Sequence, residues 1–374
     1  MQRYLVLILW SLGWAGLSAI EPEAAKDSWG LQTSAIGLML LIGMTAGETM
    51  SRLGFPRVVG YLATGLCFGP QSVAILEASL ATSLAPIEHL ALAILALHAG
   101  YQVDLGRVRA AATTVVLSLL TVTAFVLVLG TVATAFAAPF FPEVMEQQGA
   151  QETFGVIIAA LLLVSSTAAA GAILSEAGAK GRMPDVVLTL TIGLELIALL
   201  VVSLTWAEAP SLPTPGAVST AVSVSPWWTV VGSVGAGVAL GLGLRLVLST
   251  LSGAAALPLL VLCAALLPSV EATGTGVAFV FALAGLVARN LGQEERKEVF
   301  VERFGEIIGP ATGVASLVFF TLFGIHLRLP YTWAIAIAAC IVVIGRCLAI
   351  YLGVALAIRW SRAPEDLRNY WTGL

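Results

Sequence analysis

Charged residues are scarce in this chain. Asp, Glu, Lys and Arg make up only 11% of the 374 residues, whereas hydrophobic residues make up 59%. A soluble domain carries about a quarter charged residues, so this composition excludes an ordinary soluble protein. The 18 basic and 22 acidic residues leave a net charge of −4. No basic stripe runs along the chain, which excludes nucleic acid as a partner.

Residues that catalysis or a resident metal would need are equally few. The chain has three His and four Cys. Cys67, Cys263, Cys340 and Cys347 lie in apolar stretches without metal-ligand spacing, so each is expected to be a small buried hydrophobe. No Ser-His-Asp order is credible, and the Gly-rich segment 273–276 has no following Lys. We therefore expect neither an enzyme nor a cofactor.

Long apolar runs, in contrast, are abundant. About 20 apolar residues cross the hydrocarbon core of a bilayer, and in lipid a helix satisfies its own backbone. The runs fall at 31–52, 55–76, 86–103, 108–138, 154–176, 185–206, 228–250, 256–271, 275–290, 306–328 and 333–358. A further apolar segment, 1–20, is a signal peptide or an extra helix. The sequence predicts an all-α polytopic membrane protein of about eleven such helices.

Basic residues gather in alternate loops. One side carries Arg52, Arg57, Arg107, Arg109, Lys180, Arg182, Arg289, Arg296, Lys297, Arg359 and Arg362. The opposite loops are acidic or neutral, apart from Arg328, which is expected to reach the outer interface. By the positive-inside rule, the basic side and the C-terminus are expected to be cytoplasmic.

The two halves of the chain share a short pattern. Segments 97–105 and 321–329 both end in Gly, three residues, a charged residue and Leu, and they end on opposite sides of the membrane in the predicted topology. Transporters commonly contain such inverted repeats. We expect a first repeat of six helices at 31–206, a linker and linker helix at 207–250, and an incomplete second repeat at 256–374. The last two helices of that second repeat would be missing.

Glu195 lies alone in the apolar stretch 184–204. An ionisable group at membrane depth costs about 2.5 kcal/mol or more and is usually functional. An unpaired carboxyl there is expected to be protonated or cation-bound near neutral pH, and either state would permit movement across the barrier. Arg346 is placed similarly much later in the chain. The two residues predict ion or proton translocation.

Several segments resemble one family. Residues 46–70, AGETMSRLGFPRVVGYLATGLCFGP, look like the signature second helix of the monovalent cation:proton antiporters, the Kef-like and sodium–proton exchanger superfamily. Ser165-Ser166-Thr167-Ala168 resembles the polar break of its first crossing helix, and 318–324 and 344–346 look like its later signatures. The resemblance implies the inverted-repeat antiporter fold, a homodimer, and a bacterial inner (plasma) membrane location.

The resemblance also implies site residues. Glu195 falls where the family keeps its cation- and proton-binding Asp, so it would hold the transported Na⁺ or K⁺. Arg346 matches the family's basic residue. Leu194 stands where many members have a second Asp or Asn, which favours exchange of one cation for one proton. Hydroxyls of Ser165, Ser166 and Thr167, with unwound backbone carbonyls, would supply further oxygen ligands.

Other interpretations remain open for each residue. Glu195 and Arg346 are alternatively a permanent structural ion pair, or Arg346 neutralises helix ends. The hydroxyls of 165–167 alternatively bond back to preceding carbonyls. For the whole chain, the rivals to an antiporter are a non-transporting sensor or effector module, which Leu194 favours, and an ion-coupled symporter of organic anions.

Overall fold

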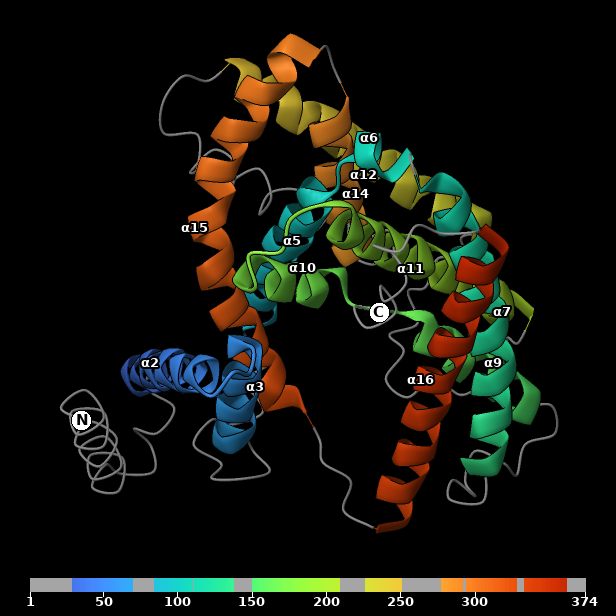
Figure 1. Ribbon diagram of the computed structural model, residues 1–374. Coiled ribbons are helices and arrows are strands. Elements are labelled where there is room, and N and C mark those ends of the chain that lie inside the picture. Colours follow the sequence, from blue (N-terminus) through green and yellow to red (C-terminus); the bar gives the residue numbers. More distant parts are fainter. Residues whose placement is uncertain are drawn as a thin grey trace. The chain divides into compact units, whose positions relative to one another are not determined.

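The computed structural model describes residues 29–69, 84–109, 111–137, 150–208, 226–250, 277–291, 294–327 and 333–361. All regular secondary structure in these ranges is α-helical, which confirms the all-α prediction (Figure 1). The helices are α2 (Trp29–Arg52), α3 (Arg57–Phe68), α5 (Ala85–Gln102), α6 (Leu105–Arg109), α7 (Ala112–Ala137), α9 (Ala150–Leu163), α10 (Thr167–Glu176), α11 (Arg182–Glu208), α12 (Pro226–Thr250), α14 (Val277–Asn290), α15 (Glu294–His326) and α16 (Trp333–Ser361). The predictions for segment 1–20, for helix 256–271 and for the Pro-rich linker lie outside the described residues.

Two predicted helices differ from the observed ones. The range 154–176 is not one helix but two, α9 and α10, separated by the irregular residues 164–166. α15 begins at Glu294 rather than near 306. Its additional first turns, residues 294–305, have the sequence EERKEVFVERFG, which is rich in charged residues, so a search for apolar runs does not detect them.

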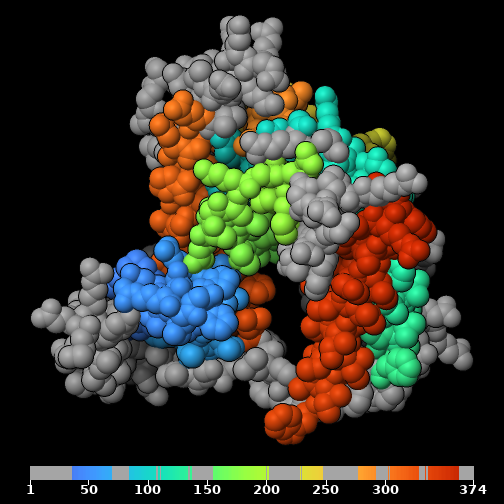
Figure 2. Space-filling model, viewed as in Figure 1, coloured from blue at the N-terminus to red at the C-terminus, as the bar shows by residue number. Residues whose placement is uncertain are grey.

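Four segments among the described residues are long and apolar enough to cross a membrane. They are Ala112–Ala133, Gly155–Glu176, Phe304–His326 and Ala336–Ser361. Arg57–Phe68, Val230–Leu246 and Val277–Asn290 are shorter apolar helices. One side of α16 is uncovered along its length (Figure 2). The exposed apolar residues Trp333, Ile337, Ile344, Leu348 and Tyr351 lie within about 60° of one line along α16, and Val343 and Trp360 are exposed elsewhere on the helix. A stripe of this kind suits contact with lipid rather than with water.

The described residues form two compact units, the first from the ranges 1–92 and 311–329. In this unit α3 packs closely on the end of α15. A Cβ atom at Gly65 would overlap the carbonyl oxygen of Thr321, and a Cβ at Gly324 would lie 2.6 Å from the carbonyl oxygen of Leu62. Glycine is therefore required on both sides of this contact, as it often is where membrane helices approach closely.

The second unit comprises the ranges 93–310 and 330–374. Within it α16 lies alongside α7, which in turn packs against α9 (Figure 1). The hydroxyl of Thr121 in α7 donates a hydrogen bond of 2.7 Å to the carbonyl oxygen of Gly353 in α16. α11 contacts α7, α9 and α10. As a result, the end of α9 lies next to α16, and the start of α10 lies next to α11.

Candidate functional site

Glu195 lies near the middle of α11 and is partly buried. The hydroxyl of Thr167, a fully buried residue, donates a hydrogen bond of 3.2 Å to its carboxylate. This distance is longer than the usual 2.5–3.0 Å of an O–H···O bond. Leu194, directly before Glu195, is only 1% exposed. The carboxylate is thus enclosed by protein but held by one weak contact among the described residues.

The break between α9 and α10 supplies Thr167. α9 ends at Leu163, and Ser166 caps the start of α10 because its Oγ accepts a hydrogen bond of 3.2 Å from the backbone N–H of Ala169. Ser166 is extended, with φ −61° and ψ 108°, and Ser is among the preferred residues at a helix N-terminus. A break at membrane depth leaves backbone carbonyls outside the helical ladder, and these need partners.

Arg346, on α16, is the partner of those carbonyls. Its Nε donates to the carbonyl oxygen of Leu162 at 2.9 Å, and its Nη2 donates to the carbonyl oxygen of Val164 at 3.2 Å and to Ser165 Oγ at 2.9 Å. A positive charge at the C-terminus of a helix also interacts favourably with the helix dipole. In the ranges that the structure describes, no ion pair joins Arg346 to Glu195.

The structure therefore divides the predicted site residues into two contacts. Thr167 meets Glu195, whereas Ser165 meets Arg346 and Ser166 caps α10. The two charged residues approach the same three-residue break from different helices. The sequence analysis expected unwound backbone carbonyls at this break, but it did not identify those of Leu162 and Val164 as partners of Arg346, because a backbone acceptor has no signature in the sequence.

Comparisons with known proteins identify the family of this chain. The model of the family described as sodium/hydrogen exchanger, transmembrane, matches residues 37–367. The chain belongs to this family. Its members are transporters rather than enzymes, and membership supports exchange of a cation for a proton. The predicted resemblance to monovalent cation:proton antiporters is confirmed.

Two solved structures share the exchanger's fold. Both are of MjNhaP1, the sodium proton antiporter from Methanocaldococcus jannaschii. The structure at pH 8 aligns with a TM-score of 0.66 and 17% identity over 91% of this chain and 81% of that one. The map from electron microscopy aligns with a TM-score of 0.68 and 17% identity over 92% of this chain and 81% of that one. No curated protein sequence matched the chain. These alignments confirm the antiporter fold.

A monovalent cation is bound by oxygen ligands and does not need a cluster of metal-ligating side chains. Within the described ranges, no group of three or more His, Cys, Asp or Glu side chains is arranged to hold a metal ion. A monovalent cation such as Na⁺ is bound instead by carboxylate, hydroxyl and carbonyl oxygens. The Glu195 carboxylate and the Thr167 hydroxyl provide the first two of these groups at one place.

Proposed function

We propose that this exchanger moves Na⁺ or K⁺ against H⁺ by competition of the two ions for the carboxylate of Glu195. The observation that carries the proposal is the contact of this carboxylate with Thr167 at the α9–α10 break. Membership of the sodium/hydrogen exchanger family supports the reaction class. The choice of Glu195 as the shared binding group is the proposal's own step.

The competition follows from the cost of a bare charge. A carboxylate inside the membrane without a counter-charge is unstable by at least about 2.5 kcal/mol on insertion scales. A bound proton or a bound cation removes that charge equally well, but the two cannot occupy the same oxygens together. Each occupant therefore displaces the other, and only an occupied carboxyl crosses the barrier at low cost.

Arg346 has a positioning role in this proposal. Its three hydrogen bonds fix the end of α9 and Ser165, which are adjacent in sequence to Thr167. The guanidinium neutralises the carbonyl dipoles there rather than the carboxylate. Because Arg keeps its charge at all physiological pH values, this contact persists whether Glu195 holds a proton or a cation.

Leu194 favours a stoichiometry of one cation for one proton. It occupies the position next to Glu195, is almost completely buried and offers no oxygen. A single carboxylate that exchanges one positive charge for another moves no net charge. A homodimer in a bacterial plasma membrane with a cytoplasmic C-terminus completes the proposal. The charge of the loops supports this orientation.

The proposal is tested with purified protein in liposomes. An acid-inside pH gradient should drive uptake of ²²Na⁺ or ⁸⁶Rb⁺ by the wild type and not by Glu195→Gln. Glu48→Gln is the matched control, because Glu48 is an exposed carboxylate paired with Arg52 at 3.2 Å. Uptake that survives Glu195→Gln removes Glu195 from the mechanism.

Leu194 also favours one second candidate, a membrane module that does not transport. Leu194 is buried and offers no oxygen beside Glu195, so it adds no second ligand at this position. Thermal unfolding in detergent separates the two functions. A transporter should unfold at higher temperature in Na⁺ or K⁺ than in choline, whereas a non-transporting module should unfold at the same temperature in all three.

A further inference from the structure

The first unit contains an ion pair between the ends of two helices. Glu88 lies in the first turn of α5, and His326 is the last residue of α15. The Nδ1 atom of His326 and the Oε2 atom of Glu88 are 3.5 Å apart. The loop charges put both helix ends on the outer side of the membrane in the predicted topology.

Hydrophobic packing holds the backbone on both sides of this pair. The apolar cluster of the unit includes Ile325, the residue directly before His326, and Leu84 packs against that cluster. The carbonyl oxygen of Leu84 accepts a hydrogen bond of 3.0 Å from the backbone N–H of Glu88. The two side chains are therefore close to each other by packing, and a change in their charge acts on an existing contact.

The strength of the contact depends on a proton. Glu88 is only 13% exposed and His326 is 42% exposed, so solvent screens the pair incompletely. His is the side chain whose charge ordinarily changes between pH 5 and 8. A negative charge at the N-terminus of α5 and a positive charge at the C-terminus of α15 are also each favoured by the helix dipole. Protonation of His326 therefore strengthens the link between the two helices.

The other charged groups around Glu88 are few. The imidazole of His89, like that of His326, interacts electrostatically with the Glu88 carboxylate. Arg328 follows His326 by two residues in the sequence and lies outside the described residues. The helices α2 and α3, which pack in the same unit, carry their charged residues at their opposite, predicted cytoplasmic ends; these are Glu48, Arg52 and Arg57.

The second unit contains an equivalent helix contact. A Cβ atom at Gly100 of α5 would overlap a backbone carbonyl oxygen of α14, and a Cβ at Gly285 of α14 would overlap one of α5. The α3–α15 contact has the same design. Gly324 of α15 lies 224 residues after Gly100, and Gly65 of α3 lies 220 residues before Gly285. Residues at these spacings can therefore be compared between the two contacts.

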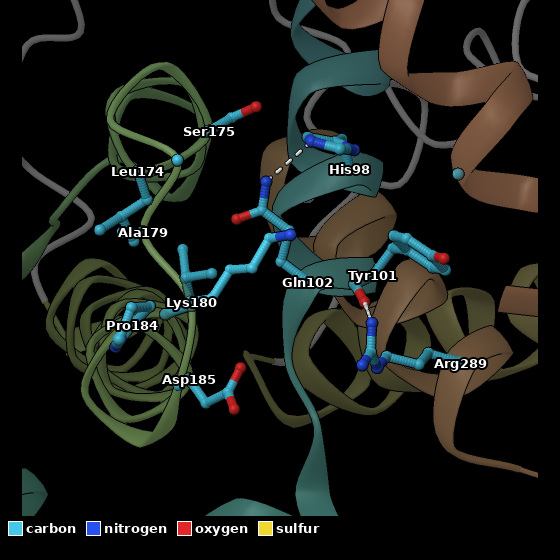
Figure 3. Close-up of a pocket in the computed structure, with 14 residues that line it drawn as sticks. His98, Tyr101, Gln102, Leu174, Ser175, Ala179, Lys180, Pro184, Asp185 and Arg289 are labelled. Carbon is cyan, nitrogen blue, oxygen red and sulfur yellow. Dashed lines mark hydrogen bonds between the residues drawn. The ribbon is translucent and has the colours of Figure 1, made fainter. Parts of the chain in front are cut away.

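The charged link at the end of the α5–α14 contact does not depend on histidine. Arg289 of α14 pairs with Asp104 at 3.6 Å, and an Asp–Arg pair keeps both charges near neutral pH. Figure 3 shows this end of α5, with Arg289 and Gln102. At the spacings above, Arg289 corresponds to Gly69, which has no side chain, and Gln102 corresponds to His326. The outer contact thus has a titratable residue where the inner one has an uncharged amide.

We propose that Glu88 and His326 form a proton-dependent link on the outer side of the exchanger, which strengthens when the outside is acidic and then slows exchange. Both α5 and α15 have residues in each of the two units. A bond between them in the first unit therefore restrains two connections between the units at once. This regulation by external pH goes beyond the proposed function, because it requires neither Glu195 nor a particular cation.

Hydrogen exchange of the purified protein tests the link. The amides of residues 318–326, at the end of α15, are compared between the wild type and His326→Gln at the same pH. At pH 6 they should exchange about threefold faster in the variant, which is the effect of a partly exposed ion pair on local opening. At pH 8 the two proteins should exchange equally. Glu88→Gln should behave like His326→Gln, and the double variant should show no further increase.

His89→Gln is the matched control. It removes an imidazole next to Glu88 on α5 but none on α15, so residues 318–326 should exchange as in the wild type. Elution as a single species in detergent verifies that each variant is folded. A difference between the wild type and His326→Gln that is the same at pH 6 and pH 8 overturns the proposal, and so does an equal acceleration by His89→Gln.

Uptake of ²²Na⁺ into right-side-out membrane vesicles tests the regulation. The pH difference across the membrane is kept constant while the outer pH is set to 6 or 8. His326→Gln should transport faster than the wild type at outer pH 6 and at the same rate at outer pH 8. Equal rates at outer pH 6 overturn the proposal. If Glu195→Gln still transports while both results follow our expectation, the link stands and the proposed ion site fails.

Discussion

Replacing Arg346 tests whether this residue stabilises the helix break or forms an ion pair with Glu195. The guanidinium makes three hydrogen bonds, to the carbonyl oxygens of Leu162 and Val164 and to Ser165 Oγ. Polar contacts in membrane proteins contribute about 0.6 kcal/mol each on average, and hydrogen bonds to charged groups about 1.5 kcal/mol or more. Arg346→Met is therefore expected to destabilise the protein by about 2–4 kcal/mol.

The assay is thermal unfolding in detergent. A loss of 1 kcal/mol lowers the melting temperature of a larger domain by about 2 °C, so the expected fall is about 4–8 °C. Arg346→Lys keeps the charge but loses the planar guanidinium that reaches three acceptors. Its melting temperature should therefore lie between those of the wild type and Arg346→Met. Arg359→Met, at an exposed position of the same helix, is the control and should change the melting temperature little.

A double variant decides between the two roles. If Arg346 stabilises only the break, the effects of Arg346→Met and Glu195→Gln should add to within about 0.5 kcal/mol. A permanent ion pair would instead give a large coupling, because removal of one partner leaves the other charge buried and alone. Strong coupling, or an unchanged melting temperature in Arg346→Met, refutes the reasoning.

Three further outcomes are expected. Thr167→Val removes the hydroxyl that donates to Glu195 and should reduce the cation-induced rise in melting temperature by an amount equivalent to about 1 kcal/mol; Thr167→Ser should preserve it, and an undiminished response in Thr167→Val would exclude this hydroxyl as a ligand. The Na⁺-induced rise should grow as the pH is raised, because fewer protons then compete for Glu195, and a response independent of pH would contradict competition. Gly65→Ala places a methyl group on the Thr321 carbonyl oxygen and should cost about 1–3 kcal/mol, whereas Gly37→Ala, with no atom within 4 Å of the new carbon, should be tolerated; equal melting temperatures for both variants would show that α3 and α15 are not in close contact.

Hydropathy was sufficient to predict most of the helices, because a segment buried in lipid must be both apolar and helical. Hydropathy failed where a helical segment is not apolar, and where an apolar segment is not helical throughout. The first turns of α15 are helical but charged, so an apolar run could not reveal them. Conversely, residues 164–166 lie within the predicted run 154–176, and the structure interrupts the helix there. There the resemblance to the family, and not the hydropathy, indicated a polar break.

The residues of the candidate site were predictable as residues but not as contacts. Glu195 and Arg346 stand out because each is a charge in an apolar sequence. Their partners do not stand out. Arg346 is satisfied by backbone oxygens, which every residue has, and Thr167 differs from its hydroxyl-bearing neighbours only by the direction in which the first turn of α10 points it. Such directions are set by packing between distant segments.

The segments before and after the cap at Ser166 are held by different hydrogen bonds. Upstream, three bonds from a permanently charged group immobilise the chain. Downstream, the side-chain hydrogen bond from α10 to α11 is the longer one of 3.2 Å from Thr167 to Glu195. Under the proposed function, a change of occupant at the carboxylate would therefore reach α10 directly through Thr167, whereas the hydrogen bonds from Arg346 would hold the end of α9 in place.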